Sequence, residues 1–346
     1  MDFFHHLSPT QQFLLASAIK VVCVFAVVMP AVAYSVLAER KVSAMIQDRI
    51  GPNRVGFFGI WQPLADGIKT FLKEDFVPAH VRKAYFWLAP MVSMTPALMV
   101  LAVIPFGSQL GGEKMVIADL DVGILYTFGI VSLGVYGIVL AGYASNSKYP
   151  FLGGIRSSAQ MISYEIAMGM SVIPVFLIVG KLNLSQVIQY QAEHGWLVLY
   201  APLSFIIFVI AAFAETNRLP FDLPESEQEL VGGYHTEYSS MKFALFFMGE
   251  YANMIAASAM MVTLFLGGWT LPVGGLDRPA ESIGMGVAHI VIFMVKVAVL
   301  MGMFIWVRWM WPRFRYDQLM DLGWRRFLPL ALVNIVATAV WLWMVD

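Results

Sequence analysis

The sequence has one cysteine, Cys23, and no excess of positive charge. A single thiol excludes a disulfide framework within the chain, and it excludes a four-thiolate iron–sulfur or zinc site built from this chain alone. Lysine and arginine number 22 against 23 aspartate and glutamate residues, so nucleic acid is not expected as a partner. No Walker motif, C-x-x-C-H motif or strand-linked G-x-G-x-x-G motif occurs, which leaves nucleotide binding and covalent haem without support.

Histidines are too few in the apolar segments to hold a transmembrane haem. Of the six histidines only His289 falls within a long apolar run, and a b-type haem needs axial ligands from such runs. We therefore expect no metal site, no catalytic residue and no redox centre in this chain. Any electrons that it handles must come from another polypeptide.

Hydrophobic residues make up 59% of the 346 residues and charged residues 13%, with a mean hydropathy of +0.71. Globular chains have roughly 45–50% apolar and about 25% charged residues. A bilayer core needs about 20 mostly apolar residues per helix. Eight stretches qualify: 14–38, 85–106, 122–144, 160–180, 197–214, 243–270, 286–310 and 327–345. The sequence thus predicts an all-α integral membrane protein with eight spans, forming a single domain over residues 1–346.

Lysine and arginine are distributed unevenly among the connecting segments. The loops 39–84, 145–159, 215–242 and 311–326 hold 16 of the 22, and the opposite side holds three. Because cytoplasmic loops carry the excess of basic residues, these four loops are predicted to face the inner side and both termini the outer side.

The first inner loop, 39–84, contains a helical pattern. Apolar residues recur at helical spacing from Ile60 to Leu72, with charged residues elsewhere on the wheel, which predicts an amphipathic helix at the membrane surface. The alternative is a basic loop that only satisfies the positive-inside rule. Glu39, Asp48 and Asp66 weaken that alternative, because acidic residues do not direct topology.

The third inner loop, 215–242, is acidic on a side that should be basic. Its carboxylates are Glu215, Asp222, Glu225, Glu227, Glu229 and Glu237. Asp222, with Pro224 and Glu225 after it, fits a capped helix start, and Asp222, Glu225 and Glu229 would share one helical face. If this group is partly buried, mutual repulsion and desolvation favour proton exchange near neutral pH. If it is solvated, it is an acidic turn.

Three ionisable residues lie within predicted spans: Glu165, Glu250 and Lys296. Such residues are costly in a bilayer and normally face a polar cavity or a partner charge. One interpretation is a buried Glu–Lys pair that fixes helix packing. Three such residues favour a polar or proton pathway.

Several longer motifs resemble one family across nearly the whole chain. They are AERK at 38–41, QDRIGPNRVG at 47–56, QPLAD at 62–66, AETNRLPFDLPE at 214–225, FFMGEY at 246–251 and PRFRYDQL at 312–319. At these positions the sequence is similar to the H subunits of NADH–quinone oxidoreductase, respiratory complex I, whose mitochondrial counterpart is NADH dehydrogenase subunit 1.

The resemblance implies a quinone chamber at the inner side and an acidic path that leads away from it toward antiporter-like subunits. The matching chamber positions are Glu39, Arg40, Arg49, Asp66, Phe221, Arg308 and Arg315. The matching positions for proton coupling are Glu165, Glu215, Asp222, Glu225, Glu227 and Glu250.

The resemblance also implies ubiquinone as substrate, with NADH, FMN and iron–sulfur clusters held by partner subunits. The expected partners are the iron–sulfur and quinone-site subunits of the hydrophilic arm, the small and antiporter-like membrane subunits, and lipid. The expected location is the bacterial inner membrane, or the mitochondrial inner membrane for an organellar chain.

Two other functions remain open. One is the related membrane subunit of a membrane-bound hydrogenase-type complex, which uses other electron donors or acceptors. The other is a stand-alone ion transporter, although such folds often show inverted repeats with broken helices.

Overall fold

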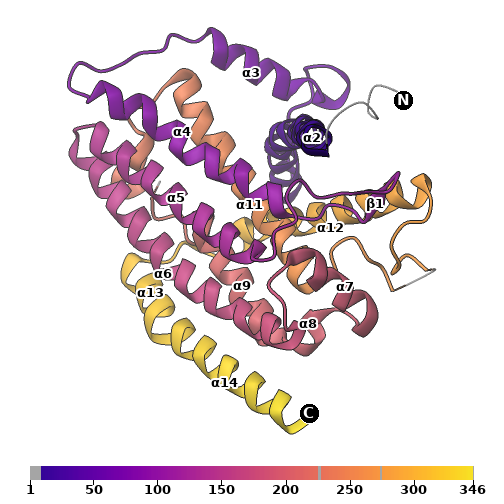
Figure 1. Ribbon diagram of the computed structural model, residues 1–346. Coiled ribbons are helices and arrows are strands. Elements are labelled where there is room, and N and C mark those ends of the chain that lie inside the picture. The colour runs from indigo at the N-terminus through magenta and orange to yellow at the C-terminus, as the bar shows by residue number, and fades with distance from the viewer. Residues whose placement is uncertain (1–8, 225–226, 273–274, 346) are drawn as a thin grey trace.

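The computed structural model describes residues 9–224, 227–272 and 275–345, and these are folded almost entirely into helices (Figure 1). The longer helices are α2 (Pro9–Ile46), α3 (Gln62–Leu72), α4 (Lys83–Met99), α5 (Gly123–Ala144), α6 (Lys148–Val179), α7 (Leu184–His194), α9 (Pro202–Glu215), α11 (Ser240–Phe265), α12 (Ile283–Met310) and α14 (Leu328–Val345). Short helices and turns are η1 (Phe57–Gly59), η2 (Val100–Val103), α8 (Leu197–Tyr200), α10 (Glu227–Leu230), η3 (Gly233–His235), α13 (Tyr316–Asp321) and η4 (Leu322–Phe327). Strands β1 (Gln109–Leu110) and β2 (Glu113–Lys114) form an antiparallel hairpin.

Seven helices in the described part are long and apolar enough to cross a membrane. They are α2, α4 with η2, α5, α6, α11, α12 and the helical stretch that ends in α14. This confirms a multi-pass, all-α membrane protein. The count of eight spans stays a prediction, because the remaining segment is shorter.

That segment, predicted at 197–214, is divided into α8 and α9. The helix is interrupted at Ala201, whose backbone leaves the helical region before Pro202 begins α9. A residue that precedes proline disfavours the helical conformation. The 14 residues of α9 measure about 21 Å at 1.5 Å per residue, less than the roughly 30 Å of a bilayer core.

The first helix is longer at its inner end than the apolar run indicates. The predicted span ended at residue 38, whereas α2 continues to Ile46. Glu39, Arg40 and Lys41 are therefore helical and not part of a loop. The sequence contains no glycine or proline here before Gly51, so nothing in the local chemistry ends the helix where the charges begin.

Small residues allow α4, α5 and α6 to approach closely. A Cβ atom at Gly137 in α5 would lie 2.5 Å from the backbone nitrogen of Ser93 in α4. A Cβ atom at Gly142 would lie 2.6 Å from the carbonyl oxygen of Pro150 in α6. In a bilayer such close backbone contact replaces the hydrophobic effect as a source of helix association.

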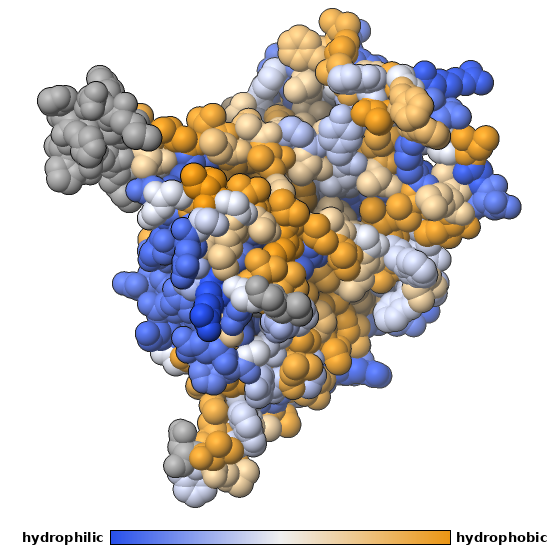
Figure 2. Space-filling view, turned by 90° about the vertical axis from the view of Figure 1, so that its right-hand side faces the viewer, coloured by the Kyte–Doolittle hydropathy of each residue, from blue (hydrophilic) through white to orange (hydrophobic). Residues whose placement is uncertain are grey.

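Helix α11 is the most buried of the seven long helices and α14 the least. Figure 1 shows α14 in yellow along the outer edge of the bundle, while α11 lies among its neighbours. The face shown in Figure 2 carries a broad hydrophobic area, with hydrophilic side chains gathered in separate groups. Such a surface fits an apolar solvent.

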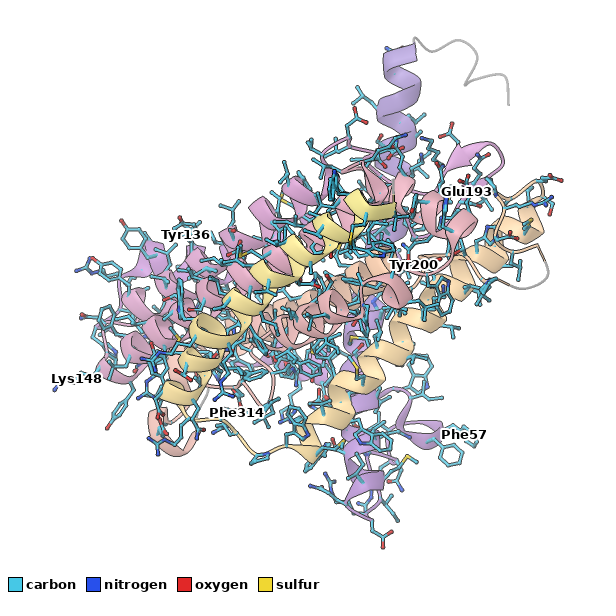
Figure 3. The ribbon with its side chains drawn as sticks, turned by 90° about the horizontal axis from the view of Figure 1, so that it is seen from below. Phe57, Tyr136, Lys148, Glu193, Tyr200 and Phe314 are labelled. Carbon is cyan, nitrogen blue, oxygen red and sulfur yellow. The ribbon has the colours of Figure 1, made fainter. Side chains whose placement is uncertain are left out.

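The two ends of the bundle carry different segments. In Figure 3, Phe57 and Phe314 lie at the lower end, and Glu193 and Tyr200 lie toward the opposite end. Helix α3 follows the turn that contains Phe57, and its bounds of Gln62–Leu72 confirm a helix within loop 39–84. The residues predicted for function on the inner side therefore gather at one end.

Candidate functional site

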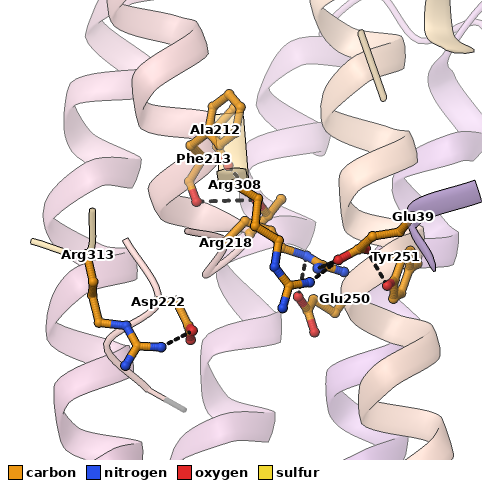
Figure 4. A network of polar contacts seen from close by, with 10 residues as sticks. Glu39, Ala212, Phe213, Arg218, Asp222, Glu250, Tyr251, Arg308 and Arg313 are labelled. Carbon is orange, nitrogen blue, oxygen red and sulfur yellow. Dashed lines mark hydrogen bonds and ion pairs between the residues drawn. The ribbon is translucent and has the colours of Figure 1, made fainter. Parts of the chain in front are cut away.

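A buried ionic cluster joins α2, α11, α12 and the loop after α9. Its members, here called the Glu39 cluster, are Glu39, Arg218, Glu250, Tyr251 and Arg308. Nη1 of Arg218 donates to both carboxylate oxygens of Glu39, at 3.0 and 3.1 Å. The Tyr251 hydroxyl donates to Oε2 of Glu39 at 2.5 Å, and Arg308 donates to Oε1 (Figure 4). Only 5% of Glu39 is exposed, so the cluster is sealed on its α2 side.

Arg218 connects the two carboxylates of the cluster. Its Nε atom lies 2.6 Å from Oε1 of Glu250, and its guanidinium lies 4.5 Å from the centre of the Tyr251 ring. Burial alone would lower the pKa of Arg218, but the negative groups of Glu250, Tyr251 and Glu39 outweigh it and hold this pKa above its usual value. Arg218 is therefore a permanent positive charge.

The four ionised groups of the cluster balance: two carboxylates face two guanidinium groups. A buried charge that loses its partner is strongly destabilising, by about 3–5 kcal/mol. Adding a proton to Glu39 or Glu250 would leave a guanidinium group short of its counter-charge. The cluster thus links the protonation of one carboxylate to the position of the others.

The loop that carries Arg218 is held by backbone contacts. Asn217 takes a left-handed conformation with φ of 51°, which asparagine tolerates better than most residues. The side-chain amide of Gln160, in α6, donates to the carbonyl oxygens of Ala214 and Phe221 at 2.7 Å each. Gln160 is fully buried and therefore ties both ends of the loop to α6.

The predicted helix start at Asp222 is not formed, and this corrects the sequence-based expectation. The next helix, α10, begins at Glu227, so Asp222 and Glu229 do not share a helical face. Asp222 instead pairs with Arg313, with Nη2 and Oδ2 at 2.8 Å. An ion pair with a distant segment has replaced the backbone N–H groups as its partner.

Phe221 is buried in an aromatic contact with the same distant segment. Its ring stacks on that of Phe314 with centroids 5.4 Å apart, and Tyr164 lies 5.7 Å away on another side. The Phe314 amide donates to the Pro220 carbonyl oxygen at 3.1 Å. The loop after α9 and the segment after α12 therefore form one unit.

The other predicted chamber residues lie nearer the surface. Nη1 of Arg40 lies 2.5 Å from Oδ2 of Asp66 and so joins α2 to α3. Arg49 is exposed and donates to Gln47. Arg315 pairs with Asp317 at 3.1 Å and is also exposed. The predicted set is thus divided between the buried cluster and an outer group.

The carboxylates predicted for proton coupling differ in their surroundings. Glu165, in α6, accepts a hydrogen bond from Ser132 in α5. Glu215, at the end of α9, is buried, and neither of its oxygens has a hydrogen-bond partner among the described residues. The two carboxylates interact electrostatically. Glu225 lies outside the described residues, and of Glu227 only the backbone, at the start of α10, is described.

A groove of about 870 Å³ follows α5 and α6 and reaches Glu165. Its walls are mainly apolar, and include Phe128, Ile166 and Phe176. Glu165 is the one carboxylate in this lining. The groove therefore brings a carboxylate to a largely apolar surface.

Lys296 has partners other than a carboxylate. Its Nζ atom donates to the carbonyl oxygens of Leu266, Gly268 and Thr270 at 2.7, 3.0 and 2.7 Å. It also lies 4.7 Å from the centre of the Trp196 ring. A cation at the C-terminal end of α11 satisfies carbonyl groups that the helix leaves unpaired.

Sequence reasoning underestimated Arg218, Tyr251 and Gln160. Arg218 was noted only as one of two cations in an acidic loop, although a lone arginine among carboxylates is itself a sign of a buried ion pair. Tyr251 directly follows Glu250, and nothing in its spacing indicated a contact with Glu39. Among the described residues, no group of three histidine, cysteine, aspartate or glutamate side chains could hold a metal ion.

Comparison with known proteins gives the family. The model of the NADH dehydrogenase family matches residues 19–339. The chain is 48% identical over 334 residues to an NADH-quinone oxidoreductase H subunit of Cytophaga hutchinsonii, covering 94% of this chain and 96% of the relative. It is 51% identical over 326 residues to the NADH-quinone oxidoreductase H subunit of Paramagnetospirillum magneticum, covering 94% and 92%. The chain belongs to the NADH dehydrogenase family.

Proposed function

We propose that this chain is the H subunit of a proton-translocating NADH–quinone oxidoreductase, in the bacterial inner membrane. The relatives bear that name over nearly their whole length. This favours the quinone enzyme over a hydrogenase-type complex or a stand-alone transporter. NADH, FMN and the iron–sulfur clusters belong to partner subunits, and the quinone is the substrate.

The proposed quinone chamber lies at the inner end of the bundle, beside the Glu39 cluster. The observation that carries this proposal is the cluster itself, in which two carboxylates and two guanidinium groups are buried together. Reduction of a quinone by two electrons requires two protons, and negative charge develops before they arrive. In a medium of low dielectric such charge acts on neighbouring groups more strongly than in water.

Arg218 and Arg308 supply positive charge on this side of the bundle, and Glu39 and Glu250 are their counter-ions. Negative charge on the quinone would compete for the guanidinium groups and favour proton uptake by the carboxylates. Glu215 and Glu165 extend this path toward the α5–α6 groove. Proton movement would then follow the redox state of the quinone.

Glu39→Gln in the assembled enzyme tests the chamber proposal. The variant keeps the side-chain shape and removes the charge that pairs with Arg218 and Arg308. NADH–quinone activity should fall by tenfold or more, on the order of 1.4 kcal/mol or above in activation free energy. NADH oxidation by an artificial acceptor that bypasses the quinone should continue at the original rate.

Glu113→Gln is the matched control, because Glu113 is an exposed carboxylate in the hairpin at the other end of the bundle. Full NADH–quinone activity in Glu39→Gln would contradict a role for the cluster at the chamber. Loss of both activities would instead report failed assembly, which the amount of intact complex checks independently.

A further inference from the structure

Helix α3 has its apolar side turned outward. None of its residues is buried, and Phe71 and Leu72 are 73% and 77% exposed. Leu64 and Ile68, on the same side of the helix, are also exposed. A surface helix of a soluble protein places this side against the core and its charged side in water. The medium around α3 must therefore be apolar.

The polar side of α3 faces the protein and fixes the helix at both ends. Asp66 is hydrogen-bonded to Arg40 of α2, at 2.5 Å, and to Gln62, at 2.8 Å. At the other end, the Ser240 hydroxyl lies 3.0 Å from the carbonyl oxygens of both Thr70 and Lys73. These contacts hold the apolar side of α3 outward. Figure 1 shows α3 beside the bundle and not within it.

The turn before α3 extends the apolar surface with aromatic residues. Phe57, Phe58 and Trp61 are all exposed. Tryptophan and other aromatic rings are enriched at the boundary between the hydrocarbon region and the headgroups. The position of α3 is therefore at the membrane boundary and not in the hydrocarbon centre.

Cations border the same surface. Lys69 and Lys73 are exposed and form no ion pair with any residue that the structure describes. Each follows an exposed apolar residue, Ile68 or Leu72, and is turned from it by about 100° around the helix axis. Long lysine side chains in this position lay their stems on apolar surface and extend the charge toward headgroups. Unpaired cations at this boundary complement anionic lipid.

We propose that α3 and the turn 57–61 form a binding surface for anionic phospholipid of the leaflet next to loop 39–84. Acyl chains pack on Leu64, Ile68 and Phe71, and the headgroup phosphate binds Lys69 and Lys73. This inference concerns lipid and does not depend on the proposed quinone chemistry.

A photo-crosslinker in the assembled enzyme tests the surface. p-Benzoylphenylalanine is placed at position 71, and the complex is reconstituted in nanodiscs of phosphatidylcholine with a minor share of phosphatidylglycerol. After illumination, mass spectrometry of the peptide that contains position 71 identifies the adduct. We expect phosphatidylglycerol adducts enriched over the bulk share by about fivefold, the scale of one favourable cation at an anionic surface.

Lys69→Gln combined with Lys73→Gln should reduce this enrichment to the bulk share. Lys148→Gln is the matched control: it removes an exposed lysine at a distance from the turn 57–61 (Figure 3) and should leave the enrichment unchanged. An adduct with another subunit, or lipid adducts in proportion to the bulk composition in the parent complex, would overturn the proposal. NADH–quinone activity measured in parallel reports the proposed function separately.

Discussion

The Nε atom of Arg218 lies 2.6 Å from Oε1 of Glu250, while Nη1 of the same guanidinium binds both oxygens of Glu39. One side chain thus joins α2 and α11 through the loop after α9. Because guanidinium groups do not lose their proton in proteins, any change of charge in this pair must occur on the carboxylates. The arrangement makes Arg218 the fixed element and the two glutamates the variable ones.

Removing Arg218 should therefore destabilise the chain more than removing either carboxylate. Arg218→Met leaves Glu39 and Glu250 buried without their shared counter-ion, at a cost of about 3–5 kcal/mol. The amount of intact complex in the membrane and its thermal unfolding midpoint should both fall. Arg218→Met with Glu250→Gln should recover part of this loss, since one unpaired charge is removed. Equal stability of the single and double variants would contradict the shared pairing.

Lys296 should stabilise the end of α11 and take no part in coupling. Lys296→Met removes three hydrogen bonds from a cation to carbonyl oxygens, and bonds to charged groups contribute about 1.5–3 kcal/mol. We expect a lower thermal unfolding midpoint with proton movement per quinone unchanged, and Lys148→Met, which removes an exposed lysine, as the unaffected control. Retained stability with lost coupling would revive the proton-pathway interpretation of Lys296.

Asp119 should make the outer end of the bundle sensitive to acid. Burial alone would raise the pKa of Asp119, but hydrogen bonds from Lys114, Asn183 and Ser185 outweigh it and lower this pKa below its usual value. A lowered carboxylate pKa contributes stability above its unfolded value and loses it as the pH falls through the folded value.

The stabilisation by Asp119 should therefore be complete at neutral pH and should disappear below about pH 4. The unfolding midpoint of the solubilised protein, measured over this range, checks the sign. Asp119→Asn should be less stable than the parent at neutral pH and should approach it in acid. A difference that grows as the pH falls would be the wrong sign.

The predicted topology can be tested with reporter fusions. The distribution of lysine and arginine places the termini outside and the four basic loops inside. Fusions after Gly112 and Asp346 should report the outer side, and fusions near Asn146 and Asp321 the inner side. A C-terminal reporter on the inner side would mean an odd number of crossings in the chain, with α9 as the segment to re-examine.

Local chemistry predicted the helices but not their ionic partners. The apolar runs and the spacing from Ile60 to Leu72 depend on neighbours along the chain, and the structure contains the corresponding helices. The partner of Asp222 is Arg313, 91 residues away, and that of Glu39 is Arg218, 179 residues away. Such pairs arise from packing of distant segments. A capping pattern at Asp222 was therefore plausible locally and wrong in the fold.

The same limit explains why helix ends were misjudged. Hydropathy ends the first span at Glu39 because carboxylates are costly in lipid, yet partners from three other segments make burial of Glu39 possible. The division of the fifth span at Ala201 depends on Pro202, a local signal that an average over hydropathy conceals.

The central claim is that buried carboxylates couple quinone reduction to proton movement, and Glu215 tests it most directly. Glu215 has no hydrogen-bond partner among the described residues, so Glu215→Gln removes a proton-binding group without breaking a bond that the structure shows. The measurement is proton uptake or release per NADH in proteoliposomes of the assembled enzyme, with Glu250→Gln alongside. The account predicts loss of most coupled proton movement in both variants, with NADH oxidation by an artificial acceptor retained. Full coupled turnover in both would contradict it.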